Sequence, residues 1–188
     1  SYLESHHNSN GTVDTVLQLT GTRLADLYDN PSDVYYKMKE TPFMQKIFPA
    51  MVDYFETENH IFVHGWIPCE KIKQNPARDT YLPIADWRNA SEGIWQKARW
   101  INGMEAAHNG ITEKDKTIVC GHWHCSYGHY MDALKEAIAN DADLTVEEFG
   151  DTAIWEPYYG NGVIAIDRCT AHTGQVNVLV LEDEFLEE

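Results

Sequence analysis

The chain has 188 residues, of which 43% are hydrophobic and 12% aromatic, and this composition predicts a single globular domain over residues 1–188 with a sizeable core. Its 14 Lys and Arg against 30 Asp and Glu leave a net charge of −16, which argues against a nucleic-acid-binding protein, because neutralising phosphates requires clustered basic side chains. No apolar run approaches the roughly 18–20 residues of a membrane-spanning helix, and the four cysteines form no Cys-x-x-Cys motif. We therefore expect no membrane partner, a cytoplasmic location and mostly reduced thiols.

The N-terminal part of the chain is predicted to be helical. Residues 13–27 have a weak helical pattern, and Ser32 is expected to cap a short helix that runs through Lys39. A clearer helix follows, with Thr41 as its N-cap and Pro42 as its first residue. Its apolar residues recur with helical spacing and predict one buried stripe, made of Met44, Ile47, Phe48, Met51, Tyr54 and Phe55.

The middle of the chain alternates between strands and helices. The short apolar runs at 60–65 (HIFVHG) and 116–121 (KTIVCG) predict buried strands. Between them we expect a loop at 74–83 and a helix over 91–108 that begins at Ser91. The side chains predicted to form the buried side of this helix are Ile94, Trp95, Ala98, Trp100 and Ile101.

The C-terminal part predicts a helix over 129–140, an irregular acidic segment over 141–161 and two strands. These strands, 162–167 and 175–182, are expected to pair as a hairpin, and an acidic tail covers 183–188. Helices that alternate with short buried strands, followed by a β-pair, predict an α/β fold.

Histidines stand where two of the predicted strands end. His64 follows the first strand, and His122 follows the second, within the stretch VCGHWHCSYGH. His124 lies two residues after His122, so in an extended segment both side chains leave the same face. Because open α/β folds bind ligands at strand ends and neutral imidazoles suit Zn, Mn, Fe or Ni, these three histidines are candidate metal ligands.

These stretches resemble a known family. GHWH at 121–124, preceded by TIVC, is similar to the Gly-His-x-His motif that closes the active site of calcineurin-like metallophosphoesterases, and ETENHIFVHGWIP at 56–68 is similar to their earlier His-Gly segment. WQKARWINGM and VIAIDRCTAHTGQVNVLVLE resemble bacterial members of the branch related to Ser/Thr protein phosphatases. The resemblance implies a mixed sheet with flanking helices that forms the C-terminal half of a four-layer α/β/β/α sandwich.

Three motifs of that family are absent from the sequence. Asp-x-His, Gly-Asp-x-x-Asp-Arg and Gly-Asn-His-Glu/Asp supply the first half of the family's dinuclear metal site, and none of them occurs here. In the family they precede the region where this chain begins. The resemblance therefore implies that the bridging Asp and the catalytic acid His lie upstream of Ser1, and no catalytic residue is assigned within the chain.

The resemblance also assigns the candidate ligands. His64 and His122 would bind one divalent ion of a pair, and His124 would bind its neighbour. Two metal ions in such a site activate a water molecule that attacks the phosphorus of a phosphoprotein, a nucleotide-like ester or another phosphoester. With only one or two imidazoles for each ion, we expect weak metal binding and little or no turnover by this polypeptide alone.

Other residues near these motifs have two interpretations each. Arg99 is either a phosphate clamp, because a guanidinium binds phosphate through two hydrogen bonds, or a solvated helix residue. Trp66 and Trp123 either line the substrate cleft or pack in the core, and Asn102 and Gly103 are candidates for shaping the same cleft. The remaining histidines are expected to be surface or structural residues: His6, His7, His108, His129 and His172.

Two non-catalytic hypotheses stand beside the phosphoesterase. In the first, one structural zinc ion is held by Cys120, His122, His124 and Cys125. In the second, the chain is an interaction module that forms a homodimer through an exposed sheet surface, because half of a two-sheet sandwich leaves apolar area that monomers seldom expose.

Overall fold

The computed structural model describes residues 11–75 and 78–182. The chain folds as two compact units, Ser1–Val52 and Asp53–Glu188. Among the helices of the described ranges, none has the length and apolar character needed to cross a bilayer.

The described part of the first unit, residues 11–52, contains short helices, as its sequence pattern predicts, and its buried apolar side chains are Val13 and Val34. Asn30, and not Ser32, precedes α4, because Pro31 fits the first turn of a helix. The helices are α2 (Thr12–Thr20), α3 (Leu24–Asp29), α4 (Pro31–Glu40), the π-helical turn η1 (Phe43–Ile47) and the 3₁₀ turn η2 (Phe48–Ala50).

The predicted buried stripe after Thr41 is wrong. The helical turns end at Ala50, and Tyr54 and Phe55 belong to strand β1 (Tyr54–Glu56) of the second unit. Ile47, Phe48 and Met51 are each more than half exposed. The physical reason is Pro49, which has no N–H to donate and restricts the residue before it, so a regular helix does not continue through this position.

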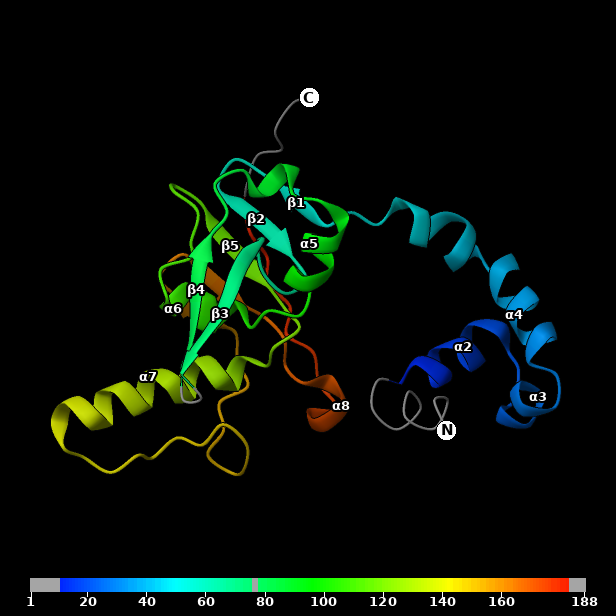
Figure 1. Cartoon of the computed structure of the whole chain (residues 1–188). Helices are drawn as coiled ribbons and strands as arrows, with labels where there is room; N and C mark the ends of the chain where they lie inside the picture. Colours follow the sequence, from blue (N-terminus) through cyan, green and yellow to red (C-terminus); the bar gives the residue numbers. More distant parts are fainter. Residues whose placement is uncertain (1–10, 76–77, 183–188) are drawn as a thin grey trace. The chain divides into compact units, whose positions relative to one another are not determined.

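The second unit is built on a mixed five-stranded sheet of order β1-β2-β5-β7-β6. Strands β1, β2 and β5 of this sheet are labelled in Figure 1. β2 (His60–Val63), β5 (Thr117–Cys120) and β7 (Val163–Ala165) run parallel in the centre. β1 and β6 (Tyr158–Gly160) pair antiparallel at the two edges. The predicted mixed α/β class and the two central strands are therefore confirmed.

Residues 69–83 form a hairpin where the sequence predicts a loop over 74–83. β3 (Cys69–Asn75) pairs antiparallel with β4 (Arg78–Pro83), and Cys69 and Tyr81 are buried. The polar composition around Pro76 hides this hairpin in the sequence, because a two-stranded ribbon can present many polar side chains and still form a complete hydrogen-bond ladder.

The predicted single helix over 91–108 is two helices. α5 spans Glu92–Ala98 and α6 spans Gly103–His108. The break occurs because Asn102 caps α6, its side chain accepting a hydrogen bond from the Glu105 N–H at 3.2 Å. Trp100 lies in the break and is 68% exposed, so its predicted place on a buried helix face is wrong.

The C-terminal hairpin also differs from its prediction. β7 pairs with β6, and residues 175–182 form no strand. Helix α8 (Thr170–Thr173) stands between them. Val176, Val178 and Val180 of this segment are exposed.

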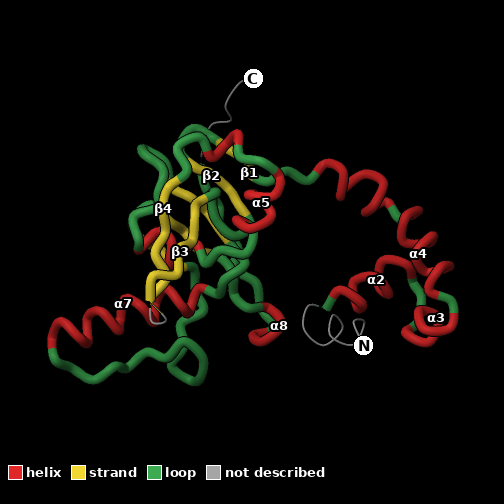
Figure 2. The backbone as a smooth tube through the Cα atoms, viewed as in Figure 1, coloured by secondary structure: helices red, strands yellow, loops and turns green. Residues whose placement is uncertain are grey.

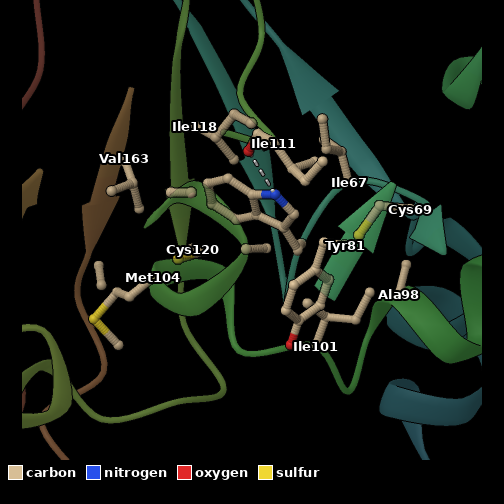
Figure 3. Packing of buried hydrophobic residues seen from close by; sticks show 14 of the residues in the cluster. Ile67, Cys69, Tyr81, Ala98, Ile101, Met104, Ile111, Ile118, Cys120 and Val163 are labelled. Carbon is tan, nitrogen blue, oxygen red and sulfur yellow. Dashed lines mark hydrogen bonds between the residues drawn. The ribbon is translucent and has the colours of Figure 1, made fainter. Parts of the chain in front are cut away.

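The core of the second unit surrounds Trp66, which is fully buried and whose indole N–H donates to the Ile111 carbonyl at 3.1 Å. Figure 3 shows Ile67, Tyr81, Ile101, Met104 and Ile118 gathered in this cluster. Trp66 therefore packs in the core and does not line a cleft. α7 (Cys125–Asn140) contacts β6, and the segment from Asp141 to Pro157 after it has no helix or strand (Figure 2).

A partly buried hydrogen-bond network joins α6, α7 and β6. The Tyr158 hydroxyl donates to Asp132 Oδ2 at 2.9 Å and lies 3.0 Å from His108 Nε2. Burial lowers the pKa of His108 below its ordinary value of 6.5, and Lys135 acts in the same direction, while Asp132 opposes both. The folded state therefore favours the neutral imidazole.

This network predicts a pH-dependent stability. Because folding lowers the pKa of His108, its stabilisation is complete above about pH 6.5 and is lost as the pH falls through the lower folded pKa. We expect the free energy of unfolding, measured in urea, to fall less steeply below pH 6.5 in His108→Gln than in the wild type. Equal slopes in the two proteins would contradict this assignment.

Candidate functional site

The carboxyl ends of three parallel strands meet at one edge of the sheet. In the pairing register, Val63 of β2 lies opposite Cys120 of β5, and Cys120 lies opposite Ala165 of β7. The pairing of β2 with β5 continues by one hydrogen bond beyond the strand ends, in which the Gly121 N–H donates to the His64 carbonyl at 3.0 Å. This edge is where open α/β folds carry ligand-binding groups.

The register brings His64 and His122 together. Their ring centroids are 5.0 Å apart, with the ring planes inclined by 51°. His64 is exposed, and His122 is partly buried. The centroids of the His122 ring and the Trp100 indole are 5.1 Å apart, and the two ring planes are almost perpendicular. The two strand-end histidines predicted to share a metal ion are thus neighbours in space.

His122 has an unusual backbone conformation. Its φ is +63°, and the Trp123 N–H donates to the Gly121 carbonyl at 2.7 Å, which makes a three-residue γ-turn centred on His122. The positive-φ form of this turn is rare and strained, and such strain persists mainly where the surrounding structure imposes it. The turn directs the chain from β5 into α7 and sets His122 beside His64.

The surroundings of His122 favour its neutral form. Burial lowers the pKa of His122, and the adjacent His64 lowers it further, while Asp167 raises it. A neutral imidazole has one ring nitrogen with a free lone pair, which is the form that binds a metal ion. Asp167 follows β7 at the same sheet edge, and its carbonyl accepts a hydrogen bond from the Cys125 N–H at 2.8 Å.

His124 has different partners. Its Nε2 lies 2.8 Å from Glu148 Oε1, and its ring stacks on Trp123 with centroids 5.8 Å apart. Phe149 and Trp155 also contact the His124 ring, at 4.5 and 6.1 Å. The segment after α7 therefore supplies a carboxylate and two aromatic rings to His124.

The donor set at this edge fits part of a metal site. Within residues 11–75 and 78–182, no three His, Cys, Asp or Glu side chains converge closely enough to hold a metal ion. The His64 and His122 imidazoles are a chemically suitable pair of donors for Zn, Mn, Fe or Ni, and they leave the other coordination positions to water or further ligands.

Cys120 and Cys125 pack in the core. Burial raises the pKa of both thiols, that of Cys125 to about 11, and Cys125 Sγ donates to the Ala165 carbonyl at 3.1 Å. Zinc binds thiolates, and these surroundings favour protonated thiols. The four side chains of the structural-zinc hypothesis are not gathered into one ligand set.

Arg99 is engaged in ion pairs. Its Nε and Nη2 both donate to Asp53 Oδ1, at 3.0 and 2.6 Å, and Nη2 also donates to Glu92 Oε1 at 3.2 Å. The carboxylate of Asp53 raises the pKa of the guanidinium. In this arrangement Arg99 fastens the start of β1 to α5, and a phosphate would have to compete with two carboxylates for it.

The remaining candidate residues have structural contacts. His108 and His129 both contact the Tyr158 ring, and His172 contacts Phe149 and Trp155, while His6 and His7 lie outside the described residues. Sequence reasoning did not identify Glu148 or Asp167. Each is far along the chain from the histidine that it approaches, and a single acidic residue in an acidic chain gives no local signal.

Comparisons of the chain with protein-family models, with curated proteins and with solved structures give no match. Function must therefore be inferred from the motifs and from the geometry of the strand ends.

Proposed function

We propose that the chain contributes part of the active centre of a metal-dependent phosphoester hydrolase of the calcineurin-like type, in which His64 and His122 hold one divalent ion and His124 serves a neighbouring ion. One observation supports this proposal most directly. Two histidines in the order and motifs of that family lie 5.0 Å apart, centroid to centroid, at the carboxyl ends of adjacent parallel strands.

The bound ions would polarise the phosphoryl oxygens and activate a water molecule for attack on phosphorus. Residues of the chain position the proposed metal ligands and keep His122 neutral. The γ-turn holds His122 beside His64, and the lowered pKa of His122 keeps its lone pair available near neutral pH. Trp123 adds a buried indole N–H without a hydrogen-bond acceptor among the described residues, which an anionic ligand could satisfy.

His124 is prepared differently. Metal-ligating histidines commonly donate their second ring N–H to a carboxylate, which fixes the tautomer and the ring orientation. Glu148 lies at Nε2 of His124 in a position to do this, which would leave Nδ1 as the metal-binding atom. The observed mixed sheet with flanking helices agrees with the half-sandwich of this family. The half-sandwich itself is part of the proposal.

The metal-binding part of the proposal is tested by titrating the full chain with Ni²⁺ and following the heat of binding. We expect weak binding by the wild type and a loss of affinity of roughly tenfold or more in His64→Ala and in His122→Ala. His129→Ala is the matched control, because His129 packs against Tyr158, and it should keep the wild-type affinity.

Hydrolysis of 4-nitrophenyl phosphate with added Mn²⁺ gives the second measurement. The wild type should show no rate above that of His122→Ala, because the sequence lacks the family's carboxylate motifs. A clear rate that disappears in the variant would show that the histidines of this chain suffice. Unchanged Ni²⁺ affinity in both histidine variants would overturn the proposed metal site.

A further inference from the structure

A groove of about 820 Å³ is lined by residues of β3 and of α5 and the turn after it. Residues 69–72 of β3 form one wall, together with Ile84, and residues of α5 form the other together with Trp100 and Ile101, which follow this helix. Its size is within the range of pockets that hold small organic ligands.

Trp100 connects this groove to the histidine pair. Its indole lines the groove, is 68% exposed, and meets the His122 ring edge-on with centroids 5.1 Å apart. A large exposed aromatic side chain in this position can stack on a flat ring of a ligand. A molecule in the groove would therefore extend toward His64 and His122 past Trp100.

The walls of the groove combine apolar and cationic groups. Ile72, Ile84, Ile94 and Ile101 supply the apolar part. Lys71 in the lining pairs with Glu105 at 3.8 Å and Glu70 adds a carboxylate, whereas Lys97 has no carboxylate partner among the described residues. In a chain with a net charge of −16, the ammonium group of Lys97 beside isoleucines and an indole favours a ligand that is both apolar and anionic.

We propose that this groove binds the aromatic part of an aryl phosphomonoester whose phosphoryl group lies toward His64 and His122. The proposal rests on the proposed function and adds the substrate class. The ring of the ester lies against Trp100 and the isoleucines, and Lys97 attracts its phosphate.

Gly93 allows a sharp test. It lines the groove, and a Cβ atom added at this position meets no atom within 4 Å. Gly93→Leu therefore adds a branched side chain at the groove wall without displacing the backbone, and leucine is also the better helix former. Gly93→Ala adds only a methyl group and is the matched control.

The experiment compares the binding of 1-naphthyl phosphate and ethyl phosphate to the full chain by calorimetry. We expect the wild type and Gly93→Ala to bind 1-naphthyl phosphate at least about tenfold more tightly, since burying the ring removes apolar surface from water. Gly93→Leu and Trp100→Ala should bind the two esters with similar affinity.

Equal affinities of the wild type for both esters, or a preference that Gly93→Leu retains, would overturn the proposal. The Ni²⁺ titration of the same proteins distinguishes a failure of the groove assignment from a failure of the proposed metal site. Gly93→Leu should bind Ni²⁺ like the wild type, so a loss of aryl preference with intact metal binding supports the groove assignment. Equal Ni²⁺ affinities of the wild type and His122→Ala would instead overturn the proposed function, whatever the affinities for the two esters are.

Discussion

Gly65→Ala should lower the free energy of unfolding by about 3 kcal/mol, the upper end of the range for overpacking a core. Gly65 is buried directly after His64, and a Cβ atom there would lie 2.6 Å from the carbonyl oxygens of both Ala98 and Arg99. The backbone N–H of Trp66 also donates to the Ala98 carbonyl at 3.1 Å. The two carbonyl oxygens are backbone atoms, so no flexible side chain can move away to relieve the contact.

The same substitution should disturb the site. Relief of the contact requires the end of β2 to move away from the end of α5, and these segments carry His64 and Trp100. We therefore expect weaker Ni²⁺ binding in Gly65→Ala even under conditions where the protein stays folded. Gly93→Ala, where the added Cβ meets nothing, should be stabilised by about 1 kcal/mol in the same urea titration. Similar stability of Gly65→Ala and the wild type would contradict the close approach.

His122→Gly should be more stable than His122→Ala by about 1 kcal/mol, while both lose Ni²⁺ binding. Neither variant has the imidazole, so the comparison isolates the cost of the positive φ at this position. Glycine populates positive φ readily, whereas alanine has a Cβ that clashes with the backbone there.

This result would mean that the γ-turn favours glycine for stability and carries histidine for another reason. Urea unfolding of the two variants, with Ni²⁺ titration of each, measures both effects. An alanine variant as stable as the glycine variant would show that the turn relaxes and stores no strain. The interpretation that a strained backbone holds His122 for metal binding would then be wrong.

The sequence predicts the central part of this structure well because its signals are local. HIFV and TIVC are short apolar runs, and a histidine follows each, so strand identity and the position of the candidate ligands can be predicted together. Parallel pairing then brings His64 and His122 together, which the order of elements in an α/β fold already favours.

The failures have equally specific causes. Pro49 interrupts an apolar pattern that otherwise fits a helix, and Asn102 competes as a cap inside a continuous helical pattern. The β3–β4 hairpin is polar, so its pairing depends on backbone hydrogen bonds that composition does not reveal. Glu148 and Trp100 reach their histidines through tertiary packing, for which no periodicity exists.

The parallel pairing of β2 with β5 has a consequence for folding. His64 and His122 are 58 residues apart in the chain, and the β3–β4 hairpin, α5 and α6 all lie between them. A long loop must close before the two imidazoles meet, and contacts of this sequence separation form slowly. The unfolded chain therefore offers no preformed pair of donors, and any ion held by both histidines stabilises the folded state by mass action. Metal affinity at the proposed site would thus be linked to the integrity of the central sheet.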